Sequence, residues 1–111
     1  AIARALLGGP RILLMDEPFG ALDEITRDRL NEELLRIWRE TGTTIVFVTH
    51  SIHEAAFLGQ KVLMMAARPG RVSSDFRVTE PYPRGEDFRT SAAYAEWCRQ
   101  ASQRLEQAMA A

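Results

Sequence analysis

The sequence predicts an α/β layered fold whose central sheet is largely parallel. Helix-forming and strand-forming stretches alternate along the chain in the order helix, strand, helix, strand, short helix, strand, which is typical of this class. The first two strand-forming stretches are short and apolar, as in strands that helices cover on both faces. Ionisable side chains follow each of them, and in such folds ligands bind at the carboxyl ends of strands.

The alternation begins with a helix and a strand. Residues 1–7 are rich in alanine and leucine and are expected to be helical, and Gly8-Gly9-Pro10 is expected to end that helix. The continuously apolar run 12–15 then predicts a strand that is buried on both faces.

A longer helix and a second strand follow. Asp23 is a favourable N-cap for a helix from about residue 24 to residue 40, and Gly42 is a favourable stop. Helical spacing of its apolar residues predicts one packed face, formed by Leu30, Leu34, Ile37 and Trp38. Residues 44–48, which are β-branched and aromatic, predict the second buried strand.

A short helix and two more strands are expected next. Ser51 and Glu54 fit a capping box, so a helix should start directly after His50. Residues 61–66 predict a third strand, 68–71 a hairpin-like turn, and 72–78 a more polar strand near an edge.

The C-terminal part reads as a loop and an amphipathic helix. Residues 79–89 contain two prolines and are expected to be a loop, and residues 91–109 a helix. Its apolar stripe consists of Tyr94, Trp97, Cys98, Ala101, Leu105 and Ala108. We therefore divide the chain into residues 1–78, a domain part that carries the chemistry, and 79–111, the loop and terminal helix.

Composition and charge exclude several classes of function. The 111 residues include 14 Lys and Arg against 15 Asp and Glu, so the net charge of −1 gives no basic field for nucleic acid or an anionic membrane. The single cysteine, Cys98, excludes an internal disulfide and a multi-cysteine zinc site. The opening residues read as though the chain starts partway through a helix, and we expect a fragment of a longer protein.

Ionisable residues end the first two predicted strands. Asp16 and Glu17 follow the first, and His50 follows the second. If these strands are parallel neighbours, the three side chains share one edge of the sheet, which suits a metal–phosphate site. An apolar run followed by Asp is also the pattern that places a carboxylate on Mg²⁺ in P-loop nucleotide hydrolases. Such a site needs a rigid, dry strand, with Glu17 facing the attacking water and His50 reaching the γ-phosphate.

Simpler readings stay open for each residue alone. An Asp-Glu pair after a strand is commonly a solvated turn, a histidine at a strand end is commonly a cap or a surface residue, and Asp23 can be only an N-cap. Trp38 and Trp97 fit core positions.

The combination of motifs is more specific than its parts. RILLMDEPFGALD, with VTHS beginning thirty-two residues after Asp16, resembles the ATP-binding subunit of ABC transporters. In that family LLMDEP is the Walker B motif, GALD is the D-loop and the histidine of VTH is the switch histidine. The opening AIARALLGGP resembles the segment that follows the LSGGQ signature, so the resemblance is dense from residue 1 to about residue 72.

The resemblance implies a P-loop NTPase-like fold, of which this chain is the C-terminal part, and a set of roles. Asp16 would bind Mg²⁺ through water, Glu17 would be the catalytic base and His50 would contact the γ-phosphate, so that all three belong to an ATP–Mg²⁺ site. Asp23 would contact the second ATPase subunit of a dimer.

The later sequence narrows the branch. EAAFLGQKVLMMAARPGRV resembles importers for nitrate, sulfonates and taurine. That branch implies a membrane permease and, indirectly, a periplasmic solute-binding protein as partners, no nucleic acid, and a peripheral position on the cytoplasmic face of the bacterial inner membrane.

Two family motifs are absent from the 111 residues. There is no GxxxxGK[ST] phosphate loop and no LSGGQ, so the isolated chain is expected neither to bind ATP tightly nor to hydrolyse it. Without the strand that carries the phosphate loop, the sheet should be incomplete and expose apolar surface. The alternative is a non-catalytic regulatory or degenerate half-domain that pairs with intact ATPase subunits; an ABC-type ATPase outside transport is a further rival.

Overall fold

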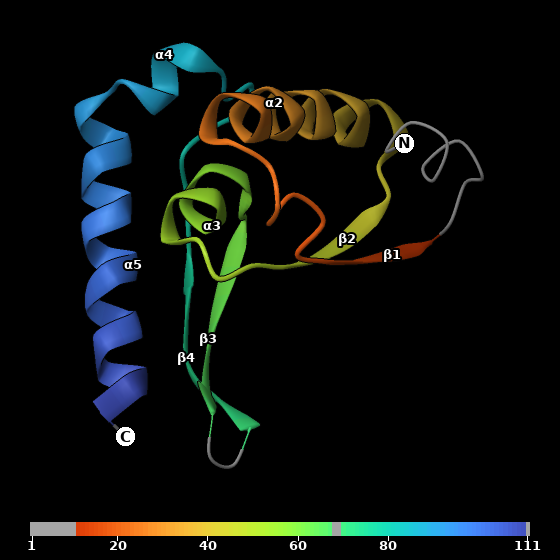
Figure 1. Cartoon of the computed structure of the whole chain (residues 1–111). Helices are drawn as coiled ribbons and strands as arrows, with labels where there is room; N and C mark the ends of the chain where they lie inside the picture. Colours follow the sequence, from red (N-terminus) through yellow and green to blue (C-terminus); the bar gives the residue numbers. More distant parts are fainter. Residues whose placement is uncertain (1–10, 68–69, 111) are drawn as a thin grey trace. The chain divides into compact units, whose positions relative to one another are not determined.

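A computed structural model describes residues 11–67 and 70–110. The chain divides into two compact units, Ala1–His50 and Ser51–Ala111, which are described separately. The helix predicted over residues 1–7 lies outside the described residues. Figure 1 shows helices and strands in both units, and the α/β class predicted from the sequence is confirmed.

The first unit contains a parallel strand pair joined by a helix. Strand β1 (Ile12–Asp16) pairs with β2 (Thr44–Val48) in parallel, with Ile12 opposite Thr44 and Asp16 opposite Val48. Helix α2 (Glu24–Thr41) makes the crossover between them (Figure 1). A parallel pair needs such a crossover, because its strands must start at the same end.

Helix α2 begins and ends where its sequence predicts. Asp23 is extended at φ −67° and ψ 165°, and its side chain accepts a hydrogen bond from the Thr26 N–H at 2.7 Å. Gly42 adopts the left-handed conformation at φ 69°, where glycine avoids the steric cost of a Cβ, and its N–H donates to the Trp38 carbonyl at 2.8 Å. The residues buried on this helix are Asn31, Leu34, Leu35 and Ile37.

One face of the β1–β2 pair is exposed, so the prediction that both strands are buried on both faces is wrong for this chain. Side chains alternate between the faces of a strand, and Ile12 and Leu14 are each 67% exposed. Val46 and Val48 of β2, at 48% and 42%, lie opposite Leu14 and Asp16 of β1. The apolar surface expected of an incomplete sheet is therefore present on this face.

The second unit is built on a short helix and a hairpin. Helix α3 (Ile52–Leu58) starts after Ser51, whose hydroxyl accepts from the Glu54 N–H at 3.2 Å, as the capping-box pattern predicts. Strands β3 (Lys61–Ala67) and β4 (Gly70–Arg77) pair antiparallel.

The pairing of β3 and β4 corrects one expectation. The described residues contain one parallel and one antiparallel pair, and not a largely parallel sheet. A connection as short as the one between β3 and β4 permits only antiparallel pairing, which the hairpin-like turn in the sequence had indicated.

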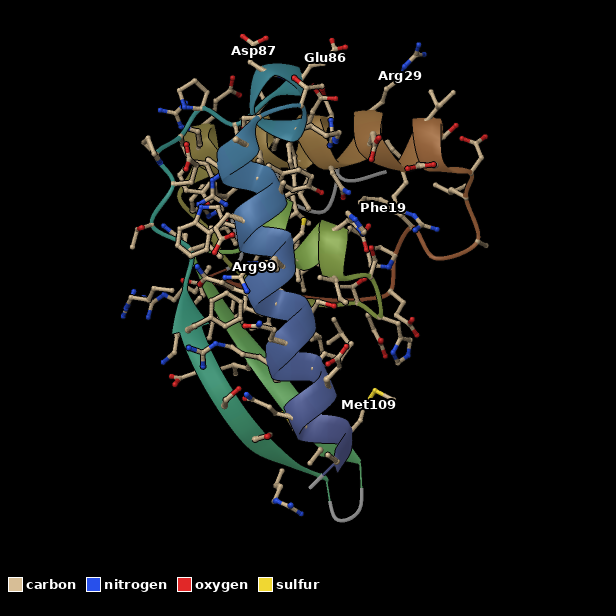
Figure 2. The ribbon with its side chains drawn as sticks, turned by 90° about the vertical axis from the view of Figure 1, so that its left-hand side faces the viewer. Phe19, Arg29, Glu86, Asp87, Arg99 and Met109 are labelled. Atoms are coloured by element: carbon tan, nitrogen blue, oxygen red, sulfur yellow. The ribbon has the colours of Figure 1, made fainter. Side chains whose placement is uncertain are left out.

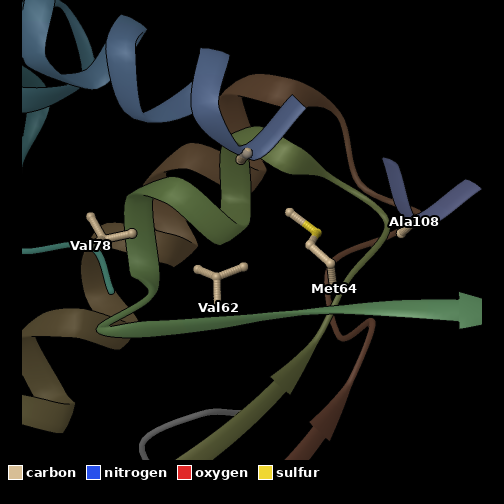
Figure 3. Packing of buried hydrophobic residues seen from close by; sticks show 5 residues of the cluster. Val62, Met64, Val78 and Ala108 are labelled. Atoms are coloured by element: carbon tan, nitrogen blue, oxygen red, sulfur yellow. The ribbon is translucent and has the colours of Figure 1, made fainter. Parts of the chain in front are cut away.

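The hydrophobic core of the second unit lies between the hairpin and the terminal helix α5 (Ala92–Ala110). Figure 3 shows Val62 and Met64 of β3 close to Val78 and Ala108. Partly buried residues pack around this cluster, namely Ile52, Ala55, Phe76, Trp97 and Leu105. The apolar stripe predicted for the terminal helix is thus its packed face.

The segment between β4 and α5 is more ordered than a plain loop. It contains the one-turn helix α4 (Glu86–Arg89), which the sequence reading missed inside the predicted loop 79–89. Arg84 is 3% exposed, and its guanidinium donates to four main-chain carbonyls, those of Phe57, Gly59, Val78 and Glu80. The Tyr82 hydroxyl donates to the Leu58 carbonyl at 2.9 Å, so this segment is tied to the end of α3.

Candidate functional site

The carboxyl ends of β1 and β2 bring Glu17 and His50 together. His50 Nε2 lies 3.3 Å from Glu17 Oε1. The Glu17 N–H donates to the Val48 carbonyl at 2.7 Å, which extends the strand ladder by one residue. Because β1 and β2 are parallel and in register, the residues that follow them emerge at the same edge. This shared edge is the arrangement expected from the sequence.

Glu17 has an unusual backbone conformation. Its φ of 46° lies in the left-handed region, which costs free energy for a residue with a side chain. The Glu17 carbonyl accepts from the Gly20 N–H at 3.2 Å, so the chain turns sharply straight after the strand. Such conformations persist only where surrounding contacts hold them, and they are frequent at functional sites.

The side chains at this edge are open to solvent. The His50 side chain is 87% exposed and that of Glu17 is 42% exposed, and Asp16 is exposed as well. The dry strand end expected from the sequence is therefore not found in this chain.

Asp23 lies at the other end of the loop that follows Glu17. Hydrogen bonding from Thr26 lowers the pKa of the Asp23 carboxyl below its ordinary value, and the charge of Arg29 adds to this effect. The carboxylate is exposed and its N-cap role is established by geometry. No ion pair or hydrogen bond joins Asp16 or Asp23 to His50 within residues 11–67.

The loop between Glu17 and Asp23 is anchored by two residues that the sequence reading missed. Phe19 is 6% exposed and its ring lies 5.9 Å from that of Phe47 in β2 (Figure 2 labels Phe19). Arg27 Nη2 donates to the carbonyls of Gly20 at 3.3 Å and Leu22 at 3.1 Å. A large aromatic residue in a turn between two exposed carboxylates was the available signal for Phe19, whereas an arginine four residues after an N-cap carries no distinctive pattern.

The donors at this edge fit a magnesium ion only together with phosphate oxygens. Among the residues that the structure describes, no three His, Cys, Asp or Glu side chains gather as a metal site. Magnesium in nucleotide sites is commonly held by one or two carboxylates together with phosphates and water, and Asp16 offers one exposed carboxylate of this kind.

Comparison with known proteins identifies the class. No protein-family model matches the chain. A putative ATP-binding protein of Brucella melitensis is 50% identical over 95 residues, which cover 86% of this chain and 40% of that protein. The aliphatic sulfonates import ATP-binding protein SsuB of Bacillus cereus is 46% identical over 106 residues, 96% of this chain and 41% of SsuB. The taurine import ATP-binding protein TauB of Ruegeria pomeroyi is 49% identical over 82 residues, 74% of this chain and 30% of TauB.

The chain is homologous to the ATP-binding proteins of ABC transporters, and its relatives include sulfonate and taurine import proteins. It spans about two fifths of the length of the Brucella and Bacillus relatives. No helix within the described ranges is long and apolar enough to cross a membrane.

Proposed function

We propose that this chain supplies the Walker B, D-loop and switch-histidine part of an ABC importer's ATP-binding subunit. The whole subunit would hydrolyse Mg–ATP to drive uptake of a small anion such as nitrate, a sulfonate or taurine. The observation that carries the proposal is the 3.3 Å approach of His50 to Glu17 at the shared ends of two parallel strands. Similarity to sulfonate and taurine import proteins supports the substrate class.

The proposed chemistry divides among the residues of this edge. Water attacks the γ-phosphorus, the bond to the bridging oxygen breaks, and Glu17 accepts the water proton as general base. His50 holds Glu17 and the γ-phosphate in register, with its Nε2 on the side of the carboxylate. Asp16 would hold Mg²⁺ through water, and the bound ion would neutralise charge on the phosphates.

The proposal also assigns partners. A second ATPase subunit would contact the loop that ends at Asp23. ATP hydrolysis would drive transport by a membrane permease, to which a periplasmic solute-binding protein would deliver the solute. The subunit would then sit peripherally on the cytoplasmic face of the inner membrane. Residues 1–78 would belong to the nucleotide-binding domain, and 79–111 would form the appended loop and helix.

The test is a pair of variants in an intact subunit. A suitable protein is a chimera in which this segment replaces the 106 matching residues of the Bacillus cereus relative. Glu17→Gln removes the general base but keeps the shape of the side chain, so turnover should fall by about 10²–10⁴-fold with ATP affinity retained. Glu24→Gln, a neutralised exposed glutamate in the first turn of α2, is the matched control. Unchanged turnover in Glu17→Gln would remove this residue from the catalytic role.

A second candidate is a non-catalytic module that pairs with intact subunits. On the main proposal, the purified chain alone turns over no Mg–ATP and does not change turnover by the intact Bacillus cereus relative. A change in that relative's turnover on adding the chain would support the module. Turnover by the chain alone would contradict both candidates.

A further inference from the structure

Arg27 contacts the loop between Glu17 and Asp23 at two points. It lies in α2, one turn after the N-cap Asp23, and helical side chains lean toward the N-terminus, so this arginine reaches back over the preceding loop. A single nitrogen, Nη2, donates to the carbonyl of Gly20 at 3.3 Å and to that of Leu22 at 3.1 Å. Its Nε is buried without a hydrogen-bond partner, which places the side-chain stem against protein and not in solvent.

These two contacts lie at the middle of the loop and next to its C-terminal end. Gly20 donates its N–H to the Glu17 carbonyl at 3.2 Å while its own carbonyl accepts from Arg27. Leu22, the other acceptor, directly precedes Asp23 and donates its N–H to the Phe19 carbonyl at 3.1 Å. Arg27 is thus linked to the Glu17 backbone through Gly20, which bonds to both residues. It is linked to Asp23 through Leu22, the residue that directly precedes Asp23.

The strained backbone of Glu17 depends on contacts that hold the loop in place. A residue at φ 46° relaxes unless neighbouring contacts hold it, and a cationic donor makes stronger hydrogen bonds to carbonyls than a neutral one. We propose that Arg27 is a positioning residue, which fixes the loop so that Glu17 and Asp23 keep their places for hydrolysis. This inference rests on the proposed ATPase function for its consequence, but its structural part can be tested without nucleotide.

Three variants separate the donors of Arg27 from its charge and packing. Arg27→Met keeps an apolar stem and removes the donors. Arg27→Lys keeps a single nitrogen with three donors, which suits a site where one nitrogen contacts both carbonyls. Arg29→Met is the matched control, since Arg29 is exposed on the same helix and points outward, away from Phe19 (Figure 2).

The structural arm is amide hydrogen exchange at Gly20 and Leu22 in the 111-residue chain. Both amides should exchange about tenfold faster in Arg27→Met than in the parent, at an intermediate rate in Arg27→Lys, and at the parent rate in Arg29→Met. Equal exchange in Arg27→Met and Arg29→Met would overturn the inference, whether or not the chain belongs to an ATPase.

The functional arm is turnover by the chimera. Arg27→Met should lower kcat about tenfold and leave the KM for ATP within about twofold, with recovery in Arg27→Lys. A loss of kcat that Arg27→Lys does not recover, or one accompanied by an equal rise in KM, would overturn the positioning role. A chimera whose parent form has no turnover would count against the proposed function, and the exchange experiment would still decide whether Arg27 restrains the loop.

Discussion

At the scale of single residues, the candidate site depends on the pairing of Glu17 with His50. Neither residue is distinctive alone, since exposed glutamates and histidines are common on protein surfaces. Their 3.3 Å approach follows from strand register, because Asp16 of β1 lies opposite Val48 of β2. Glu17 is the next residue after Asp16, and His50 comes two residues after Val48. The left-handed backbone of Glu17 is a second, independent sign of a constrained position.

The pairing leads to a prediction for His50. In the chimera, His50→Ala should lower kcat by about 10²-fold and change nucleotide affinity little, because the histidine would act mainly on the transition state. His53→Ala is the control, since this second histidine is exposed on α3 and the family resemblance gives it no role. Steady-state kinetics on both variants provides the measurement, and equal kcat in the two would contradict the role of His50.

At the scale of elements, helix α3 is held mainly by side chains from the C-terminal segment. Tyr94 of α5 donates to the His53 carbonyl in the first turn at 3.0 Å, and Tyr82 donates to Leu58 in the last. Arg84 donates to Phe57 and Gly59 at the same end at 3.0 and 2.9 Å. Burial lowers the pKa of Arg84, and the neighbouring Tyr82 and Glu80 oppose that effect. The terminal helix and its preceding loop are therefore structural parts of this unit.

Arg84→Met should destabilise the second unit. It removes hydrogen bonds from four carbonyls, of which at least those of Phe57 and Val78 are engaged in buried bonds, so the free energy of unfolding should fall by about 3 kcal/mol. Urea unfolding combined with amide exchange in α3 measures the loss in this unit. Arg77→Met, which alters an exposed arginine of β4, is the control and should change stability by less than about 0.5 kcal/mol. Equal stability of the two variants would show that Arg84 does not hold the segment.

Elements whose signals are local could be predicted from the sequence. Asp23, Gly42 and Ser51 mark helix ends through hydrogen bonds that span only a few residues, and the structure has each of them as expected. The one-turn helix α4 is too short for a periodic pattern. The contacts of Arg27 and Arg84 end on main-chain carbonyls, which every residue carries, so no pattern of side chains indicates them.

At the scale of the whole molecule, an apolar run predicts that a strand is buried but does not indicate which elements bury it. Ile12 and Leu14 belong to a run that is typical of a fully buried strand, yet both are 67% exposed here. Coverage depends on layers that come from elsewhere in a fold, and this chain spans about two fifths of relatives that are otherwise close to it in sequence. The shared edge of β1 and β2 was predictable because it depends only on two adjacent strands.

The most direct test of the central claim is a crystal structure of the chimera with Mg²⁺ and a non-hydrolysable ATP analogue. We expect a ring nitrogen of His50 within hydrogen-bonding distance of a γ-phosphate oxygen, about 3 Å, and a water molecule at a similar distance from the Glu17 carboxylate, in line with the γ-phosphorus. A bound nucleotide whose γ-phosphate lies away from both side chains would contradict the assignment of this edge as the hydrolytic part of the site.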